Sequence, residues 1–164
     1  LKRHPAGGRN LEYFSEDPVL TGQLAASYVR GVQHSSDDSN HQLVGACVKH
    51  FAVNNQESHR MVVNAVVDER TLRELYLRAF QIAIQESQPA LVMGAYNQVN
   101  GTYCCNSERL LHEILREEWK FRGVCVSDWG ATCDRGASIA SDLGWDMPGN
   151  NVVAHRNSQN ARQQ

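Results

Sequence analysis

Three short apolar runs interrupt the chain, and none of them alternates between polar and apolar positions. They lie at residues 44–48 (VGACV), 90–93 (ALVM) and 124–126 (VCV). Short runs without alternation are typical of strands that are covered on both faces, as in a parallel sheet. The pattern therefore predicts three buried parallel strands.

Between these runs apolar residues recur at three- and four-residue spacing, which predicts amphipathic helices. The first helix is expected after Asp17, an N-cap residue followed by Pro18 at the first helical position. Further helices are expected after Asp68 and Ser107, and a weaker one at 135–143. The apolar stripe that we expect the first helix to bury consists of Leu20, Leu24, Tyr28, Val29 and Val32.

Helices that alternate with apolar strands indicate an α/β fold with parallel strands and right-handed crossovers. The 164 residues hold three or four such units, whereas a closed eight-stranded barrel takes about 250 residues. An open doubly wound sheet is the alternative, but it often binds its ligand on a glycine-rich first turn, and the pair Gly7-Gly8 lacks that spacing. We therefore predict an incomplete TIM-type (β/α)8 barrel over residues 1–149, followed by a polar, disordered tail at 150–164.

Composition excludes several classes of protein. Hydrophobic residues make up 41% and charged residues 21%, which is ordinary for a globular chain. The net charge is -2 and the 16 basic residues are scattered, so no nucleic-acid partner is expected. No apolar run reaches the roughly 18 to 20 residues of a membrane span. The five cysteines have no C-x-x-C spacing, so they indicate thiols rather than a disulfide framework or a zinc site, and neither a metal nor an organic cofactor is expected.

Polar residues follow all three apolar runs. Lys49 and His50 come after the first run, Tyr96 after the second, and Asp128 and Trp129 after the third. Since active sites of α/β barrels lie at the carboxyl ends of the strands, these side chains should converge on one pocket. A carboxylate among cations stays ionised and can act as a nucleophile. The hydrogen-bond donors Lys49 and His50 suit the hydroxyls of a sugar, and the indole of Trp129 suits its apolar face. Two alternatives are that Asp128 is a helix N-cap and that Lys49 forms a Schiff base.

Five longer motifs occur in order along residues 1–149. They are KRHPAGGRNLEYFSEDP at 2–18, KHFAVNNQE at 49–57, VDERTLRE at 67–74, GAYN at 94–97 and SDWGA at 127–131. Together they resemble the N-terminal barrel domain of glycoside hydrolase family 3. The family's N-acetylglucosaminidase branch has Pro-Gly-His-Gly after its Lys-His-Phe, which this chain lacks, so the sequence is most similar to the β-glucosidase branch.

The resemblance implies a reaction and a set of site residues. The reaction is hydrolysis of terminal non-reducing β-D-glucosyl residues with retention, through a covalent glycosyl-enzyme. Asp128 matches the family's nucleophile, and the substrate is expected to be a β-glucoside or an oligosaccharide. The residues that match the family's substrate-binding positions are Arg9, Lys49, His50, Arg60, Met93, Tyr96 and Trp129.

The resemblance also implies that the chain is a fragment. In β-glucosidase-like members the acid/base comes from a following α/β sandwich domain, and none of Glu57, Asp68 and Glu69 matches it. These three carboxylates are predicted to cap helices or to form buried hydrogen bonds. The alternative function is that of a truncated, catalytically inactive fragment that binds sugar or has no function. A bacterial, cytoplasmic location is expected, with secretion left open because the N-terminus is missing.

Overall fold

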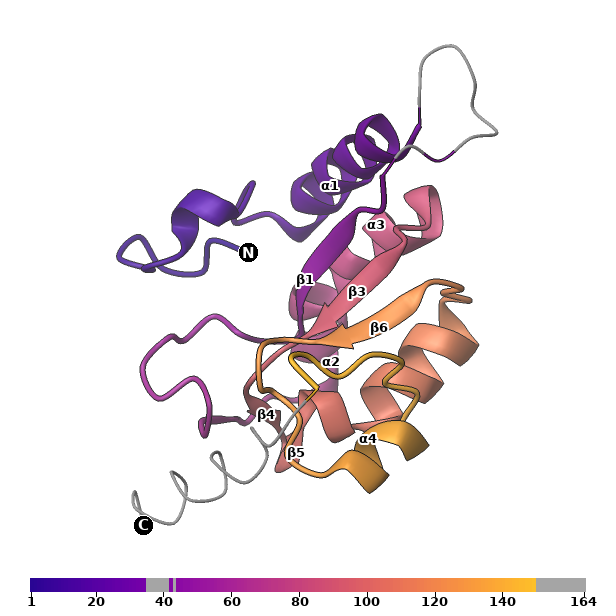
Figure 1. The fold of residues 1–164 in the computed structure, drawn as a ribbon. Coiled ribbons are helices and arrows are strands. Elements are labelled where there is room, and N and C mark those ends of the chain that lie inside the picture. Colours follow the sequence, from indigo (N-terminus) through magenta and orange to yellow (C-terminus); the bar gives the residue numbers. More distant parts are fainter. Residues whose placement is uncertain (35–41, 43, 150–164) are drawn as a thin grey trace.

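The computed structural model describes residues 1–34, 42 and 44–149. The predicted tail at 150–164 lies outside the described residues. Three parallel strands form the main sheet in the order β1 (Cys47–Phe51), β3 (Leu91–Gly94) and β6 (Val124–Ser127), side by side in Figure 1. Trp145 pairs in parallel with Val126, beyond β6. The predicted parallel α/β arrangement is therefore confirmed.

The first strand begins later than its apolar run predicts. Strand β1 starts at Cys47 and includes Lys49 and His50. The polar pair therefore lies within the strand and not after it. Within the described residues β1 pairs only with β3, so it is an edge strand. Val44 is 60% exposed and Cys47 is also exposed. The prediction that this run is covered on both faces is wrong.

Helix α1 (Pro18–Gln33) begins where its capping signal predicts. The Asp17 carboxylate accepts hydrogen bonds from the backbone N–H groups of Val19 at 2.7 Å and Leu20 at 3.2 Å. Two of the N–H groups that an α-helix leaves unpaired at its start are thereby satisfied.

The buried face of α1 differs from the predicted stripe. Of the predicted residues, Leu20, Leu24 and Tyr28 are exposed, whereas Val29 is buried. The helix packs against α3 (Arg78–Ser87) through small residues, since a Cβ on Gly22 would lie 2.7 Å from the Cβ of Ile82. Close helix packing thus decides which face is buried. The residues that α1 buries are Gly22, Ala26, Val29 and Gln33.

The second predicted helix consists of three consecutive segments. They are α2 (Glu69–Thr71), the π-helical η2 (Leu72–Tyr76) and α3. Asp68 caps the first of them, with its Oδ1 accepting from the N–H of Thr71 at 2.9 Å. The predicted start of this helix is confirmed.

The third helix is wound more widely than expected. Helix η4 (Arg109–Glu118) has the backbone hydrogen-bond pattern of a π-helix. At its end the Trp119 N–H donates to the Ile114 carbonyl at 3.0 Å. The Ser107 hydroxyl accepts from the N–H of Leu110 at 3.2 Å, as its capping role predicts. The shorter helical elements are η1 (Asn10–Glu12), η3 (Cys104–Asn106) and α4 (Arg135–Ala140).

A second, small sheet lies beside the end of β3. It consists of β2 (Asn64–Ala65), β4 (Gln98–Val99) and β5 (Thr102–Tyr103), and two-residue strands are too short to show a sequence period. Strands β4 and β5 form a hairpin through Asn100 and Gly101, whose φ angles of 49° and 91° suit an Asn-Gly turn.

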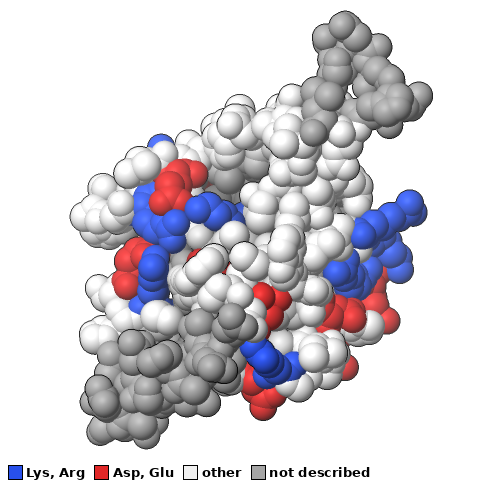
Figure 2. All heavy atoms as spheres, in the orientation of Figure 1, with Lys and Arg blue, Asp and Glu red and all other residues white. Residues whose placement is uncertain are grey.

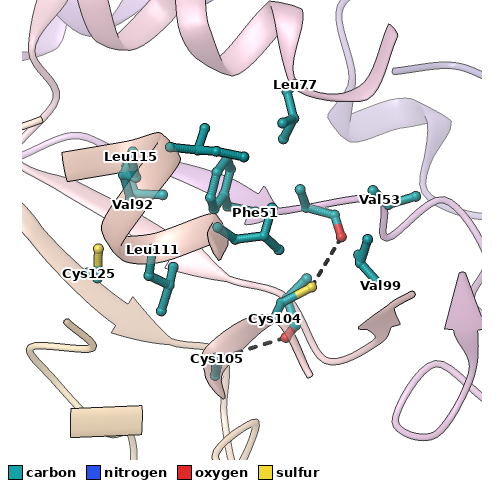
Figure 3. Close-up of a cluster of buried hydrophobic side chains, with 14 of the residues drawn as sticks. Phe51, Val53, Leu77, Val92, Val99, Cys104, Cys105, Leu111, Leu115 and Cys125 are labelled. Carbon is teal, nitrogen blue, oxygen red and sulfur yellow. Dashed lines mark hydrogen bonds between the residues drawn. The ribbon is translucent and has the colours of Figure 1, made fainter. Parts of the chain in front are cut away.

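The core fills the space between the sheet and its helices (Figure 3). Phe51, at the end of β1, is fully buried and packs edge-on against Phe80 and Trp119, with ring centroids 5.2 Å and 5.8 Å away. Since Phe51 directly follows His50, this aromatic cluster supports the end of the strand where the predicted site begins. In the part of the chain that the structure describes, no helix is long and apolar enough to cross a membrane.

The last described segment, at 144–149, is tied to the loop that follows β6. The Thr132 hydroxyl donates to Asp146 Oδ1 at 2.7 Å, and the Gly130 N–H donates to the Met147 carbonyl at 2.7 Å. Arg135 Nε lies 3.3 Å from the Asp146 carboxylate. These contacts hold the loop that carries Asp128.

Candidate active site

Asp128 lies at the carboxyl end of the main sheet, directly after β6. Its backbone N–H donates to the Gly94 carbonyl at the end of β3, with an N–O distance of 3.1 Å. Its Oδ2 lies 3.4 Å from Nε2 of His50 on β1. The carboxyl ends of β1, β3 and β6 therefore meet at Asp128. That the predicted site residues share one pocket stays a prediction.

The backbone after Asp128 fixes the orientation of its carboxylate. Oδ1 accepts from the N–H of Trp129 at 2.6 Å, while the indole of Trp129 is 62% exposed. No helix starts at this point, because α4 begins at Arg135 and is capped by Asp134. The interpretation of Asp128 as a helix N-cap is therefore wrong.

His50 faces Asp128 as a neutral imidazole. Burial, and next the positive charge of Arg9, lower the pKa of His50 to about 4, although the Asp128 carboxylate acts in the opposite direction. Nδ1 is buried and has no hydrogen-bond partner within the described residues. An unpartnered acceptor suits the tautomer that carries its proton on Nε2, toward Asp128.

His50 should therefore titrate far below an ordinary histidine. Between pH 6.5 and about 4 the unfolded chain binds a proton that folded His50 does not, so stability falls as the pH falls. We expect the His50 ring resonances in NMR, assigned with a His50→Gln variant, to titrate near pH 4. His112 serves as the control, since Asp142 raises its pKa above the usual value. Titration of His50 at or above pH 6.5 would contradict this description of the site.

Five charged side chains form a network beside the carboxylate. Arg9 pairs with Glu12 at 2.8 Å, and Lys49 Nζ lies 3.3 Å from Glu12 Oε2. Glu57 lies 2.8 Å from Arg60 and 3.7 Å from Arg9. Figure 2 shows basic and acidic side chains adjacent to one another at the left, where Figure 1 places the N-terminal segment. The sequence motifs did not single out Glu12, although its spacing from Arg9 within one turn was an available signal.

The ion pair of Lys49 bears on the Schiff-base alternative. A lysine that forms a Schiff base reacts as the unprotonated amine. Nζ of Lys49 instead forms an ion pair with Glu12, with its nitrogen 3.3 Å from Oε2. The structure thus favours a role for Lys49 as a donor of hydrogen bonds.

A second set of contacts connects Arg60 with the backbone at the site. The Arg60 guanidinium lies 4.9 Å from the ring centroid of Tyr96, and the Tyr96 hydroxyl donates to the Trp129 carbonyl at 2.8 Å. Tyr96 is 6% exposed, so its ring is buried in the protein. Met93 is half-buried on β3, in register with Val126.

The remaining candidate carboxylates have structural partners. Asp68 caps α2. Glu69 accepts from Arg73 Nε at 2.8 Å and from Arg109 Nη2 at 2.7 Å. Helix capping is what the sequence predicts for Asp68. Glu69 forms hydrogen bonds, but its side chain is 55% exposed, so the prediction of buried hydrogen bonding is wrong for this residue.

Comparison with known proteins gives one consistent family. The model described as "Glycosyl hydrolase family 3 N terminal domain" matches residues 1–141. The thermostable beta-glucosidase B of Acetivibrio thermocellus is 51% identical over 148 residues, covering 90% of this chain and 19% of that protein. An exo-alpha-(1->6)-L-arabinopyranosidase of Bifidobacterium breve is 46% identical with the same coverage.

Solved structures agree with the sequence relatives. Beta-glucosidase 3B from Thermotoga neapolitana, in complex with glycerol, has a TM-score of 0.85 and 44% identity, covering 99% of this chain and 23% of that one. This likeness confirms the predicted partial barrel. The chain spans about a fifth of the length of the curated relatives that it matches. It belongs to glycosyl hydrolase family 3, within the family's N-terminal domain.

Proposed function

We propose that the longer polypeptide carrying this segment removes terminal non-reducing β-D-glucosyl residues with retention, and that Asp128 is the nucleophile. The observation that carries the proposal is the Asp128 carboxylate at the meeting point of three strand ends, 3.4 Å from a neutral His50. A neutral imidazole that carries its proton on Nε2 can donate a hydrogen bond to Oδ2 of this carboxylate. The fixed carboxylate is available to attack.

The proposed reaction has two steps. In the first, an Asp128 oxygen forms a bond to the anomeric carbon while the bond from that carbon to the aglycone oxygen breaks, and that oxygen takes a proton from a general acid. In the second, water attacks the same carbon, releases the Asp128 carboxylate and gives its proton to the same acid/base group. Two inversions give net retention. Oδ1 is held by the Trp129 N–H, which fixes the plane of the attacking carboxylate.

The second carboxyl group is proposed to lie in the following α/β sandwich domain. A general acid needs a pKa near the working pH. The hydrogen bond from Arg9, and next that from Lys49, lower the pKa of Glu12 to about 2, so Glu12 is a poor proton donor. Glu57 is paired with Arg60 at 2.8 Å. For this reason we propose that the isolated chain is inactive or nearly so.

The sugar is proposed to bind against the charged network and Trp129. Arg9, Lys49 and Arg60 supply N–H donors for hydroxyls, and the exposed indole of Trp129 offers an apolar face. Met93, Tyr96 and His50 complete the proposed subsite. A bacterial cytoplasmic location remains a prediction of the resemblance.

The stereochemistry of the first product tests this function. Proton NMR of the full-length polypeptide with p-nitrophenyl β-D-glucoside should show β-glucose first, with α-glucose appearing only by mutarotation. The same assay with the α-L-arabinopyranoside compares the two sugars as substrates, because one relative is named for that sugar. Initial release of α-glucose, or no turnover of the glucoside, would contradict the proposal.

A further inference from the structure

Glu12 lies between two cations of the site and contacts both of them. Its two carboxylate oxygens accept from Arg9, Oε1 from Nε and Oε2 from Nη2, each at 2.8 Å. Oε2 also lies 3.3 Å from Lys49 Nζ. A bidentate contact fixes both the position and the plane of a guanidinium. One carboxylate thus sets the separation of two cations that come from distant parts of the chain.

The arrangement depends on the negative charge of Glu12. Arg9 and Lys49 carry like charges on long, flexible side chains, so without a carboxylate between them they would repel one another. The Arg9 hydrogen bond, followed by the Lys49 ammonium, keeps the pKa of Glu12 at about 2. The charge is therefore present at every pH at which a glycosidase works.

The N-terminal segment is attached to the fold at other points as well. The Asn55 side chain donates to the Leu1 carbonyl at 2.9 Å, and the Tyr13 hydroxyl donates to the Asn54 carbonyl at 3.5 Å. Arg3 donates to the hydroxyl of Tyr76 at 3.1 Å. Loss of the Glu12 charge should consequently leave the segment in place and alter mainly the two cations.

We propose that Glu12 is a positioning residue of the sugar site, which holds Arg9 and Lys49 side by side as donors to the substrate hydroxyls. The Lys49 side chain is 43% exposed, and its ammonium has three N–H groups, so donors remain after the contact with Glu12. This inference rests on the proposed function. It adds a residue that does not itself contact the sugar but determines how the sugar is held.

The test uses Glu12→Gln in the full-length polypeptide, which keeps the shape of the side chain and removes its charge. We expect kcat/KM for p-nitrophenyl β-D-glucoside to fall by about 10- to 100-fold, mainly through a higher KM. Glu12→Asp should restore part of the loss because it retains the charge. In an Arg9→Ala background Glu12→Gln should have a smaller effect, since one of its two partners is gone.

Glu16→Gln is the matched control. Glu16 is an exposed carboxylate of the same segment, and its variant should keep the wild-type kcat/KM. A Glu12→Gln variant with wild-type KM, or with a reduced kcat alone, would overturn the inference. Activity of the wild type in the same assay would still uphold the proposed function. An inactive wild type would instead overturn the proposed function. Should Glu12→Gln not fold, Glu12→Asp decides, with a raised KM in support and a wild-type KM against.

Discussion

Asp128→Asn in the full-length polypeptide is expected to lower kcat on β-glucosides by about 10⁴-fold or more, because it removes the group that forms the covalent bond. The substitution is nearly isosteric. The amide oxygen can still accept from the Trp129 N–H, a bond of 2.6 Å in the structure. The new amide group would face Nε2 of His50, which can shift its proton to the unpartnered Nδ1. The fold should therefore survive, and the loss should lie in the chemistry.

The control for this variant is Asp142→Asn. Asp142 pairs with His112 at 2.6 Å on an exposed surface, so its amide variant should retain ordinary turnover. Circular dichroism of both variants would establish that they fold alike. Wild-type turnover by Asp128→Asn would refute the assignment of the nucleophile.

Phe51→Ala should have the largest effect on stability. The ring is fully buried and packs against Phe80 and Trp119 at centroid distances of 5.2 Å and 5.8 Å. Removing a phenyl group from a packed core costs about 3–5 kcal/mol of unfolding free energy. Because Phe51 follows His50 on β1, the cavity should also loosen the site. Urea unfolding followed by tryptophan fluorescence would measure the loss.

Two further variants calibrate that measurement. Phe51→Leu fills part of the cavity and should lose less stability than the alanine variant. Phe14→Ala removes the same group from a residue that is 45% exposed, and it should cost about 1 kcal/mol or less. If Phe51→Ala cost no more than Phe14→Ala, Phe51 would not be central to the core.

Local signals in the sequence predicted where the elements begin. Asp17, Asp68 and Ser107 all accept the backbone hydrogen bonds expected of N-cap residues. Apolar runs found the three parallel strands, with β1 displaced toward Lys49 and His50. These features depend on neighbouring residues, so a single sequence contains them.

Features that depend on tertiary contacts were missed. Spacing predicted that α1 would bury Leu20 and Leu24. Instead α1 approaches α3 closely at Gly22, so the face that carries Gly22 is the buried one. The π-helical winding of η4 was missed because a stripe such as Leu110, Leu111, Ile114 and Leu115 fits either helix. The small sheet β2-β4-β5 was missed because its strands are too short to carry a pattern.

At the site, too, local signals were predictive and tertiary contacts were missed. Strand polarity alone predicted that His50 and Asp128 would converge, and the structure places them 3.4 Å apart. The bridging role of Glu12 was not predicted, because it depends on how the N-terminal segment lies against β1. The N-cap interpretation of Asp128 failed because the cap of α4 is Asp134.

The central claim is that Asp128 forms the covalent bond to the sugar. Mass spectrometry of the full-length polypeptide after incubation with an activated 2-fluoro-glucoside tests it most directly. The good leaving group needs little help from a general acid, and fluorine slows the release of the intermediate. We predict a stable adduct on the peptide that contains Asp128. An adduct on a different residue, or none in a preparation that turns over β-glucosides, would contradict the assignment.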